Sequence, residues 1–215
     1  IKISNLEALD HAGIPRRAVA ENAVRFFLKQ VLEMGLFHAD AHPGNFFVQA
    51  GGRIALVDYG MVGRVSETVR MHLLRGGLAA LHHDAEALAE ELYALGVAGE
   101  KAEHRAFLRD LDHALGRYAG ATVSDVSAAR VVDELNTLAF RHKLQLPSEL
   151  ALLFRVLVMS EGMGLMLDPG FKFLEYANPL IKQAWARRHS ARTVLTRAGQ
   201  AAVEAFELGT QLPGR

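Results

Sequence analysis

Apolar residues repeat at helical spacing near the start of the chain. They stand between Pro15 and Gly35, at Ala20, Val24, Phe27, Leu28 and Val31. Such a stripe predicts an amphipathic helix with one buried face. Proline suits the first turn of a helix and glycine suits its end, so this helix is expected to lie between Pro15 and Gly35.

The part of the chain after Ser66 also has helical periodicity. Ser66 and Asp84 are good N-caps for the apolar runs that follow them, and Pro147 precedes another helix. The most apolar run, residues 151–167, carries Arg155 and Glu161, and we expect a buried helix that is too short to span a bilayer. In this part of the chain, helices are expected near residues 66–83, 84–95, 101–118, 127–142, 147–165, 172–188 and 191–208.

Two short runs break the helical pattern. NFFVQ (45–49) and RIALVD (53–58) are rich in β-branched and aromatic residues, and AGG (50–52) joins them. Two glycines between such runs predict a β-hairpin. We expect this hairpin to be the only strand pair, so the predicted fold is mainly α, a helical bundle with one small β-hairpin.

Composition narrows the function classes. Half of the 215 residues are apolar, enough for a sizeable core. Lys plus Arg and Asp plus Glu number 24 each, so no basic field attracts nucleic acid. There is no cysteine, which excludes disulfides and thiolate chemistry. No signal peptide follows Ile1, and we expect the sequence to be a piece of a longer protein.

The polar segment FHADAHPGN (37–45) and the later DYG (58–60) carry the candidate chemistry. Asp40 and Asn45 share one loop, and Asp58 follows the hairpin. Because hairpin strands run out and back, Asn45 and Asp58 should lie side by side. Carboxylate and amide oxygens are ligands that Mg²⁺ prefers, together with substrate phosphates. The pattern predicts a magnesium–phosphate site.

The spacing resembles the phosphoryl-transfer site of protein kinases. His38-Ala39-Asp40 corresponds to H-R-D, Asn45 to the asparagine five residues later, and Asp58-Tyr59-Gly60 to D-F-G. GLFHADAHPGNFFV (35–48) and GRIALVDYGMVGRVSE (52–67) are similar to the UbiB/ADCK family of atypical kinases, associated with ubiquinone biosynthesis. IKISNLEALDHAGI (1–14) and the segment 146–179 extend the likeness, so it covers nearly the whole chain.

The resemblance implies a role for each loop residue. Asp40 would be the catalytic aspartate, which orients or deprotonates the acceptor. Asp40, Asn45 and Asp58 would bind the cofactor, with Asn45 and Asp58 as Mg²⁺ ligands. His42 is assigned to catalysis as a phosphate contact, with a loop brace as the equal alternative. His38 is expected to order the loop rather than to react.

The two residues after Asp58 also receive expectations. Gly60 should allow an unusual backbone angle. Tyr59 should pack as the family's phenylalanine does. Phe107, Leu111 and Leu115 have helical spacing and are expected in the core.

The resemblance also implies domain organisation and partners. Residues 1–215 would form one kinase-like C-terminal lobe, with 36–64 carrying the catalytic loop, hairpin and metal-binding segment. The expected cofactors are ATP and Mg²⁺. No nucleotide-gripping N-lobe motif stands in the sequence, so the chain by itself should bind ATP weakly and turn over little.

The phosphoryl acceptor would be water, a lipid or a quinone precursor. The protein would act in the cytoplasm or at the surface of the cytoplasmic membrane.

Three alternative functions stay open. They are a small-molecule phosphotransferase of the aminoglycoside/choline kinase type, a non-catalytic kinase-like scaffold, and a metallohydrolase with His38-x-Asp40-x-His42 as ligands.

Overall fold

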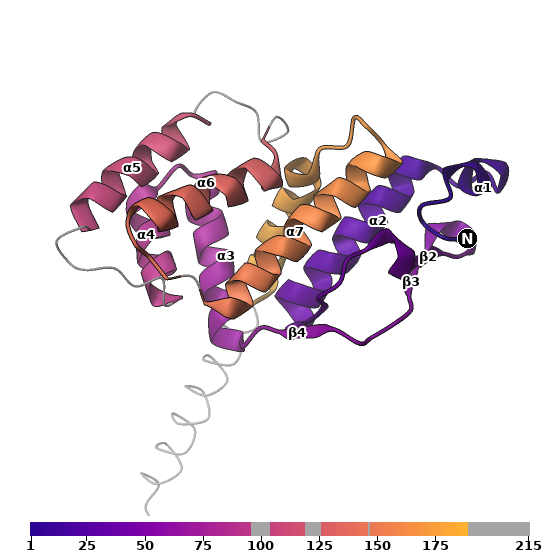
Figure 1. Ribbon diagram of the computed structural model, residues 1–215, viewed down its shortest axis with the longest axis horizontal. Helices are drawn as coiled ribbons and strands as arrows, with labels where there is room; N and C mark the ends of the chain where they lie inside the picture. Colours follow the sequence, from indigo (N-terminus) through magenta and orange to yellow (C-terminus); the bar gives the residue numbers. More distant parts are fainter. Residues whose placement is uncertain (96–103, 119–125, 146, 189–215) are drawn as a thin grey trace, which may run out of the picture.

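The computed structural model describes residues 1–95, 104–118, 126–145 and 147–188. These residues are mainly helical, as predicted, with short antiparallel strands beside one end of the helices (Figure 1). The expected helix at 191–208 lies outside the described residues. The helices are α1 (Leu6–His11), α2 (Arg16–Lys29), α3 (Glu67–Leu81), α4 (Ala85–Ala94), α5 (His104–Gly116), α6 (Ala128–Arg141), α7 (Ser148–Leu167) and a helix over 173–188.

The predicted helix boundaries follow from local hydrogen bonds. The side chain of Ser66 accepts from the Val69 N–H at 3.2 Å and begins α3, and Asp84 accepts from the Ala87 N–H at 2.9 Å and begins α4. Pro15 is the N-cap of α2. A π-helical turn, Gln30–Met34, extends α2 to Gly35, whose left-handed φ of 69° ends it.

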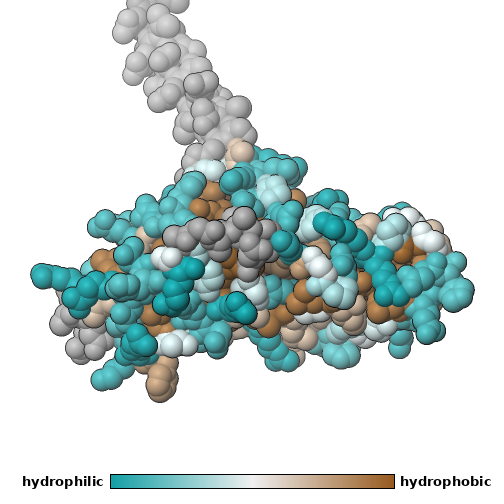
Figure 2. All heavy atoms as spheres, turned by 90° about the horizontal axis from the view of Figure 1, so that it is seen from above, coloured by the Kyte–Doolittle hydropathy of each residue, from teal (hydrophilic) through white to brown (hydrophobic). Residues whose placement is uncertain are grey.

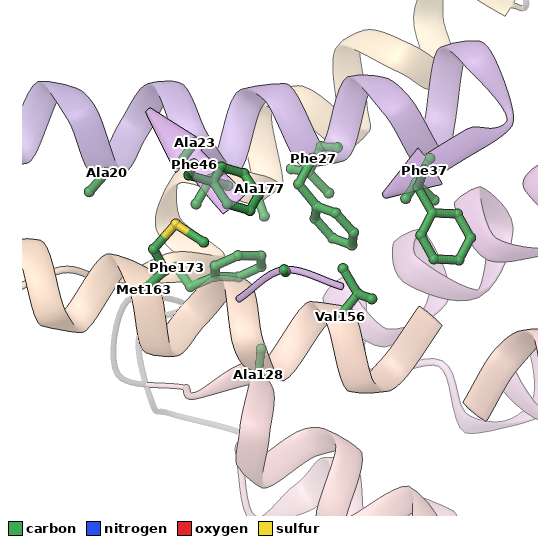
Figure 3. Close-up of a cluster of buried hydrophobic side chains, with 14 of the residues drawn as sticks. Ala20, Ala23, Phe27, Phe37, Phe46, Ala128, Val156, Met163, Phe173 and Ala177 are labelled. Carbon is green, nitrogen blue, oxygen red and sulfur yellow. The ribbon is translucent and has the colours of Figure 1, made fainter. Parts of the chain in front are cut away.

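The main core lies between α2 and α7, which run side by side (Figure 1). Phe27 on α2 points towards Val156 on α7, and Met163 of α7 lies farther along the interface beside Phe46 and Phe173 (Figure 3). Burial of these side chains supplies the hydrophobic stabilisation that holds the layer together. The core carries the loop around Asp40, because Phe37, Ala39 and Ala41 are all buried in it.

A second core cluster forms where α4, α5 and α6 pack at the far end from α1 (Figure 1). Phe107 and Leu111 of α5 are 2 % and 1 % exposed, which confirms their predicted core role, whereas Leu115 is only half-buried. Leu150, at the start of α7, belongs to the same cluster. This helix therefore contributes to both cores.

A buried carboxylate attaches α6 to α7. Glu161 of α7 is only 5 % exposed and accepts three hydrogen bonds from the first turn of α6. The donors are the N–H groups of Ala128 at 2.7 Å and Ala129 at 2.8 Å, and the hydroxyl of Ser127 at 2.8 Å. Helix N-termini leave unpaired N–H groups and carry partial positive charge, so a carboxylate is a fitting partner.

Helix α7 corrects one argument from sequence. Its 20 residues make it long and apolar enough to cross a membrane by length and composition, contrary to the expectation that it is too short. Yet 44 % of its most apolar window is buried inside the molecule, and core helices of soluble proteins pass the same test. The expected buried helix is therefore confirmed for one face, which carries Leu153, Val156 and Met163, while Leu165 is 43 % exposed. Hydrophilic residues predominate over the face seen in Figure 2, with smaller apolar areas among them.

The predicted hairpin is confirmed as β2 (Phe46–Val48) and β3 (Ile54–Leu56), with Phe46 opposite Leu56. Residues near the N-terminus extend it, since Lys2 bridges to Phe47. The expectation of a single strand pair was wrong. Strand β1 (Leu36–His38) pairs with β4 (Val62–Arg64), with Phe37 opposite Gly63.

These strands have three residues each, too short for an alternating pattern, and no turn signal joins them as AGG joins β2 and β3. Their pairing depends on a close approach that only the fold reveals. A Cβ on Gly63 would overlap the buried Phe37 ring, so the glycine lets that ring lie directly beneath β4.

An ion cluster joins α5 to the end of α6 and supplies a pH-dependent prediction. Asp110 accepts from the Arg141 guanidinium at 3.0 Å and contacts His142 Nε2 at 2.9 Å. The hydrogen bond from Arg141, and then that from His142, lower the pKa of the Asp110 carboxyl. A lowered folded-state pKa contributes stability that is present above the ordinary pKa of about 3.9 and is lost as the pH falls below it.

We therefore expect Asp110→Asn to lower the free energy of unfolding by about 1 kcal/mol at pH 7 and by less at pH 3. Urea unfolding at both pH values measures this difference. Asp112→Asn, an exposed position on α5, is the matched control, with an expected effect within about 0.5 kcal/mol. An equal loss for Asp110→Asn at both pH values would contradict the assignment.

Candidate functional site

The polar loop begins at a buried histidine. His38 ends β1 and is 4 % exposed. Its Nδ1 accepts from the Asp40 N–H at 3.3 Å, and its Nε2 lies 2.5 Å from the carbonyl oxygen of Asp58. An accepting Nδ1 requires the proton on Nε2, which then donates to Asp58. Both ring nitrogens are thus engaged, and the expected ordering role of His38 agrees with this geometry.

Asp40 and Asn45 meet across the loop. The Asn45 side-chain Nδ2 donates to Asp40 Oδ2 at 2.9 Å and to the Asp40 carbonyl at 3.3 Å. Because the amide nitrogen faces Asp40, the amide oxygen of Asn45 is directed away from it. Asp40 is half-buried, so its carboxylate is held at the edge of the site rather than in open solvent.

The pairing of β2 with β3 brings Asp58 close to Asn45. The Val57 N–H donates to the Asn45 carbonyl at 3.0 Å, which places the two loop ends next to each other, as the hairpin predicted. The side chain of Asp58 is exposed, and its Oδ1 accepts from the Gly60 N–H at 2.9 Å. Among the described contacts, no hydrogen bond joins the Asp58 side chain to Asp40 or Asn45.

The left-handed backbone angle in this segment belongs to Asp58 and not to Gly60, where an unusual angle was expected. Asp58 itself has a left-handed φ of 63°, while Gly60 is not among the positive-φ residues. Aspartate tolerates this region because its short side chain bonds locally, here to the Gly60 N–H. The His38–Asp58 hydrogen bond holds the strained residue from the other side.

Tyr59 also departs from expectation. Its side chain is 65 % exposed rather than packed, and one edge contact joins its ring to His38, with centroids 6.0 Å apart. Val57, Met61 and Val62 nearby are each more than 40 % exposed. The segment on both sides of Asp58 therefore presents apolar side chains to solvent.

His42 braces the loop, one of its two expected roles. It is exposed, and its Nδ1 accepts from the Gly44 N–H at 3.1 Å as the cap of a 3₁₀ turn, Pro43–Asn45. A Cβ on Gly44 would come within 2.9 Å of that nitrogen, which explains the glycine. A phosphate contact by His42 stays a prediction.

The donor set fits a hard cation better than a transition metal. Carboxylate and amide oxygens from Asp40, Asn45 and Asp58 are the ligand type that Mg²⁺ takes. Within the described ranges, no three His, Cys, Asp or Glu side chains are grouped to hold a metal ion. His38 cannot serve as a zinc ligand, because both its nitrogens are engaged. The geometry therefore disfavours the metallohydrolase alternative.

Sequence reasoning missed one residue that contacts the loop from outside it. The side-chain oxygen of Gln30 accepts from the backbone N–H of His38 at 3.3 Å. The one available signal was a glutamine placed beside the apolar stripe of α2, which is weak evidence for a role.

Two family models match successive parts of the chain. Residues 1–92 match the ABC1 atypical kinase-like domain, a range that includes α1 to α3, most of α4 and the whole polar loop. Residues 111–172 match the UbiB helical domain, which includes α6 and α7.

Several curated proteins are similar over most of the chain. "Probable protein kinase UbiB" from Xanthomonas euvesicatoria pv. vesicatoria is 30 % identical over 99 % of the chain and 39 % of its own length. ACTIVITY OF BC1 COMPLEX KINASE 1, a chloroplast protein of Arabidopsis thaliana, is 32 % identical over 84 % of the chain and 26 % of its own length. An uncharacterised Synechocystis protein is 30 % identical over 84 % of the chain and 27 % of its own length.

The chain thus spans about a quarter to two fifths of these relatives. The two family matches follow one another along the chain, and the relatives' names agree with them. The chain belongs to the UbiB/ABC1 family of atypical kinase-like proteins.

Proposed function

We propose that this chain carries the magnesium-binding and catalytic half of an ATP-dependent kinase or ATPase. The observation that carries the proposal is the hydrogen-bonded loop in which Asn45 holds Asp40 and His38 holds Asp58. This arrangement brings an amide and two carboxylates to neighbouring loop ends. Family membership supports kinase-type chemistry for it.

Asn45 and Asp58 are the proposed metal ligands. Asn45 donates through its nitrogen to Asp40, which turns its oxygen outward for a cation. Asp58 is exposed, and only its Oδ1 bonds within its own turn. Mg²⁺ bound with ATP would neutralise the charge that develops on the transferred phosphoryl group.

Asp40 is the proposed base. Its Oδ2 is positioned by Asn45, and the His38 ring accepts its backbone N–H, so the carboxylate has a defined direction. Such a group can orient an acceptor hydroxyl or water and take its proton. His42, at the exposed edge of the loop, is proposed to contact a phosphate through Nε2, because its Nδ1 is already engaged.

The acceptor and the setting of the reaction rest on family likeness. We propose water or a small isoprenoid lipid, such as a quinone precursor, as acceptor, with the protein in the cytoplasm or against the cytoplasmic membrane. The proposal includes a further part of a longer protein that grips the nucleotide phosphates, as kinases require.

Asp58→Asn in the full-length protein tests the metal assignment. Loss of a ligand charge should weaken Mg²⁺-dependent ATP binding by about tenfold or more, measured by calorimetry with and without Mg²⁺. Asp84→Asn is the matched control, because asparagine also caps a helix such as α4. Unchanged Mg²⁺-dependent affinity in Asp58→Asn would refute the assignment of this ligand.

A further inference from the structure

Along one edge of strand β1, the backbone N–H and C=O groups form no hydrogen bonds with the partner strand β4. The Ala39 N–H donates to the Met61 carbonyl at 3.0 Å, and the Val65 N–H donates to the Gly35 carbonyl at 2.8 Å. The odd-numbered residues of this segment therefore point their backbone N–H and C=O groups towards β4. In an antiparallel pair alternate residues point their amides to opposite sides. The N–H of His38 therefore points away from β4.

That amide is buried and needs a partner. His38 is 4 % exposed, and an unmet buried N–H is costly. Gln30 Oε1 accepts it at 3.3 Å. Around this contact lies a small cavity in which Gln30, His38 and Ser160 are the polar side chains and the other lining residues are apolar. A hydrogen bond in such surroundings has little competition from water.

The position of Gln30 depends on the π-helical turn. Gln30 begins this turn, and its carbonyl accepts the N–H of Gly35, which closes the turn directly before β1. Glutamine here can reach the strand that follows because the helix, turn and strand are consecutive and closely packed. Single π-turns are rare and often lie at functional sites.

The contacts continue from His38 into the site. Its ring accepts the Asp40 N–H and donates to the Asp58 carbonyl, so one residue holds the backbone from which both carboxylates project. We infer that Gln30 is a positioning residue, which fixes His38 and through it the direction of Asp40 and Asp58. This inference rests on the proposed function for its catalytic meaning, whereas the positioning itself can be measured without catalysis.

Gln30→Leu and Gln30→Glu form the test pair. Leucine keeps the size and removes the acceptor, while glutamate keeps the acceptor oxygen. In Gln30→Leu, hydrogen exchange at the His38 and Asp40 amides should become about tenfold faster, and turnover of ATP by the full-length protein should fall about tenfold with little change in KM. Gln30→Glu should restore slow exchange and most of the turnover.

Two controls separate positioning from general loss of stability. The amides of Phe107 and Leu111, in the second core, should keep their exchange rates in both variants. Gln183→Leu, the same change at an exposed helical position, should alter neither exchange nor turnover. Unchanged exchange at His38 in Gln30→Leu, or fast exchange there with normal turnover, overturns the inference. Absence of turnover in the unmodified protein counts against the proposed function, and the exchange rates at His38 and Asp40 then decide the inference alone.

Discussion

Asp40→Asn is expected to slow ATP turnover by the full-length protein by about two to three orders of magnitude. Asparagine can still accept the Asn45 hydrogen bond that Asp40 Oδ2 receives at 2.9 Å, so the loop should keep its shape. A carboxamide cannot take a proton from the acceptor. The loss should therefore fall on kcat, with Mg²⁺-dependent ATP affinity little changed.

Steady-state kinetics and calorimetry on the same preparation check this expectation. The control is Asp168→Asn, since Asp168 accepts from the Gly170 N–H at 3.0 Å and asparagine can accept that bond as well. Nearly normal turnover in Asp40→Asn would show that Asp40 is not the base. An equal loss of affinity and turnover would instead assign Asp40 to nucleotide binding alone.

Glu161→Ala is expected to lower the free energy of unfolding by about 3 kcal/mol, the largest stability effect that we predict. The change removes the acceptor of three hydrogen bonds, including that of the buried Ala128 N–H at 2.7 Å. It also removes a negative charge from the N-terminus of α6. Glu161→Gln should lower the free energy of unfolding by about 2 kcal/mol, because the amide N–H group of glutamine would face the backbone N–H donors.

Urea unfolding followed by circular dichroism measures both variants. Glu90→Gln is the matched control, an exposed glutamate on α4 whose change should stay within about 0.5 kcal/mol. A stability loss below about 0.5 kcal/mol in Glu161→Ala would mean that α6 and α7 are held together by apolar packing alone.

Local patterns predicted most of the secondary structure. Ser66 and Asp84 begin the helices that they were expected to cap, and the two glycines of the turn gave the β2–β3 hairpin. These features depend on neighbours within a few residues, so sequence periodicity and turn chemistry are sufficient to read them. The spacing of His38, Asp40 and Asn45 likewise identified the loop and its family.

The errors lie where distant segments meet. Strands β1 and β4 were missed because they lie far apart in the sequence with no turn joining them, and their pairing depends on the Phe37 ring beneath Gly63. An unusual backbone angle was expected at Gly60 from its residue type. It belongs to Asp58, because contacts from His38 and Gly60 hold that residue in place.

The helices, the β2–β3 hairpin and the oxygen-bearing residues of the polar loop could be read from residue type and short-range spacing. How that loop is held depends on contacts between distant segments. The amide of His38 turns away from β4 towards Gln30, and the carboxylate of Glu161 reaches the start of α6 from another helix. Both contacts satisfy buried polar groups, and which polar groups become buried together depends on how the whole chain packs.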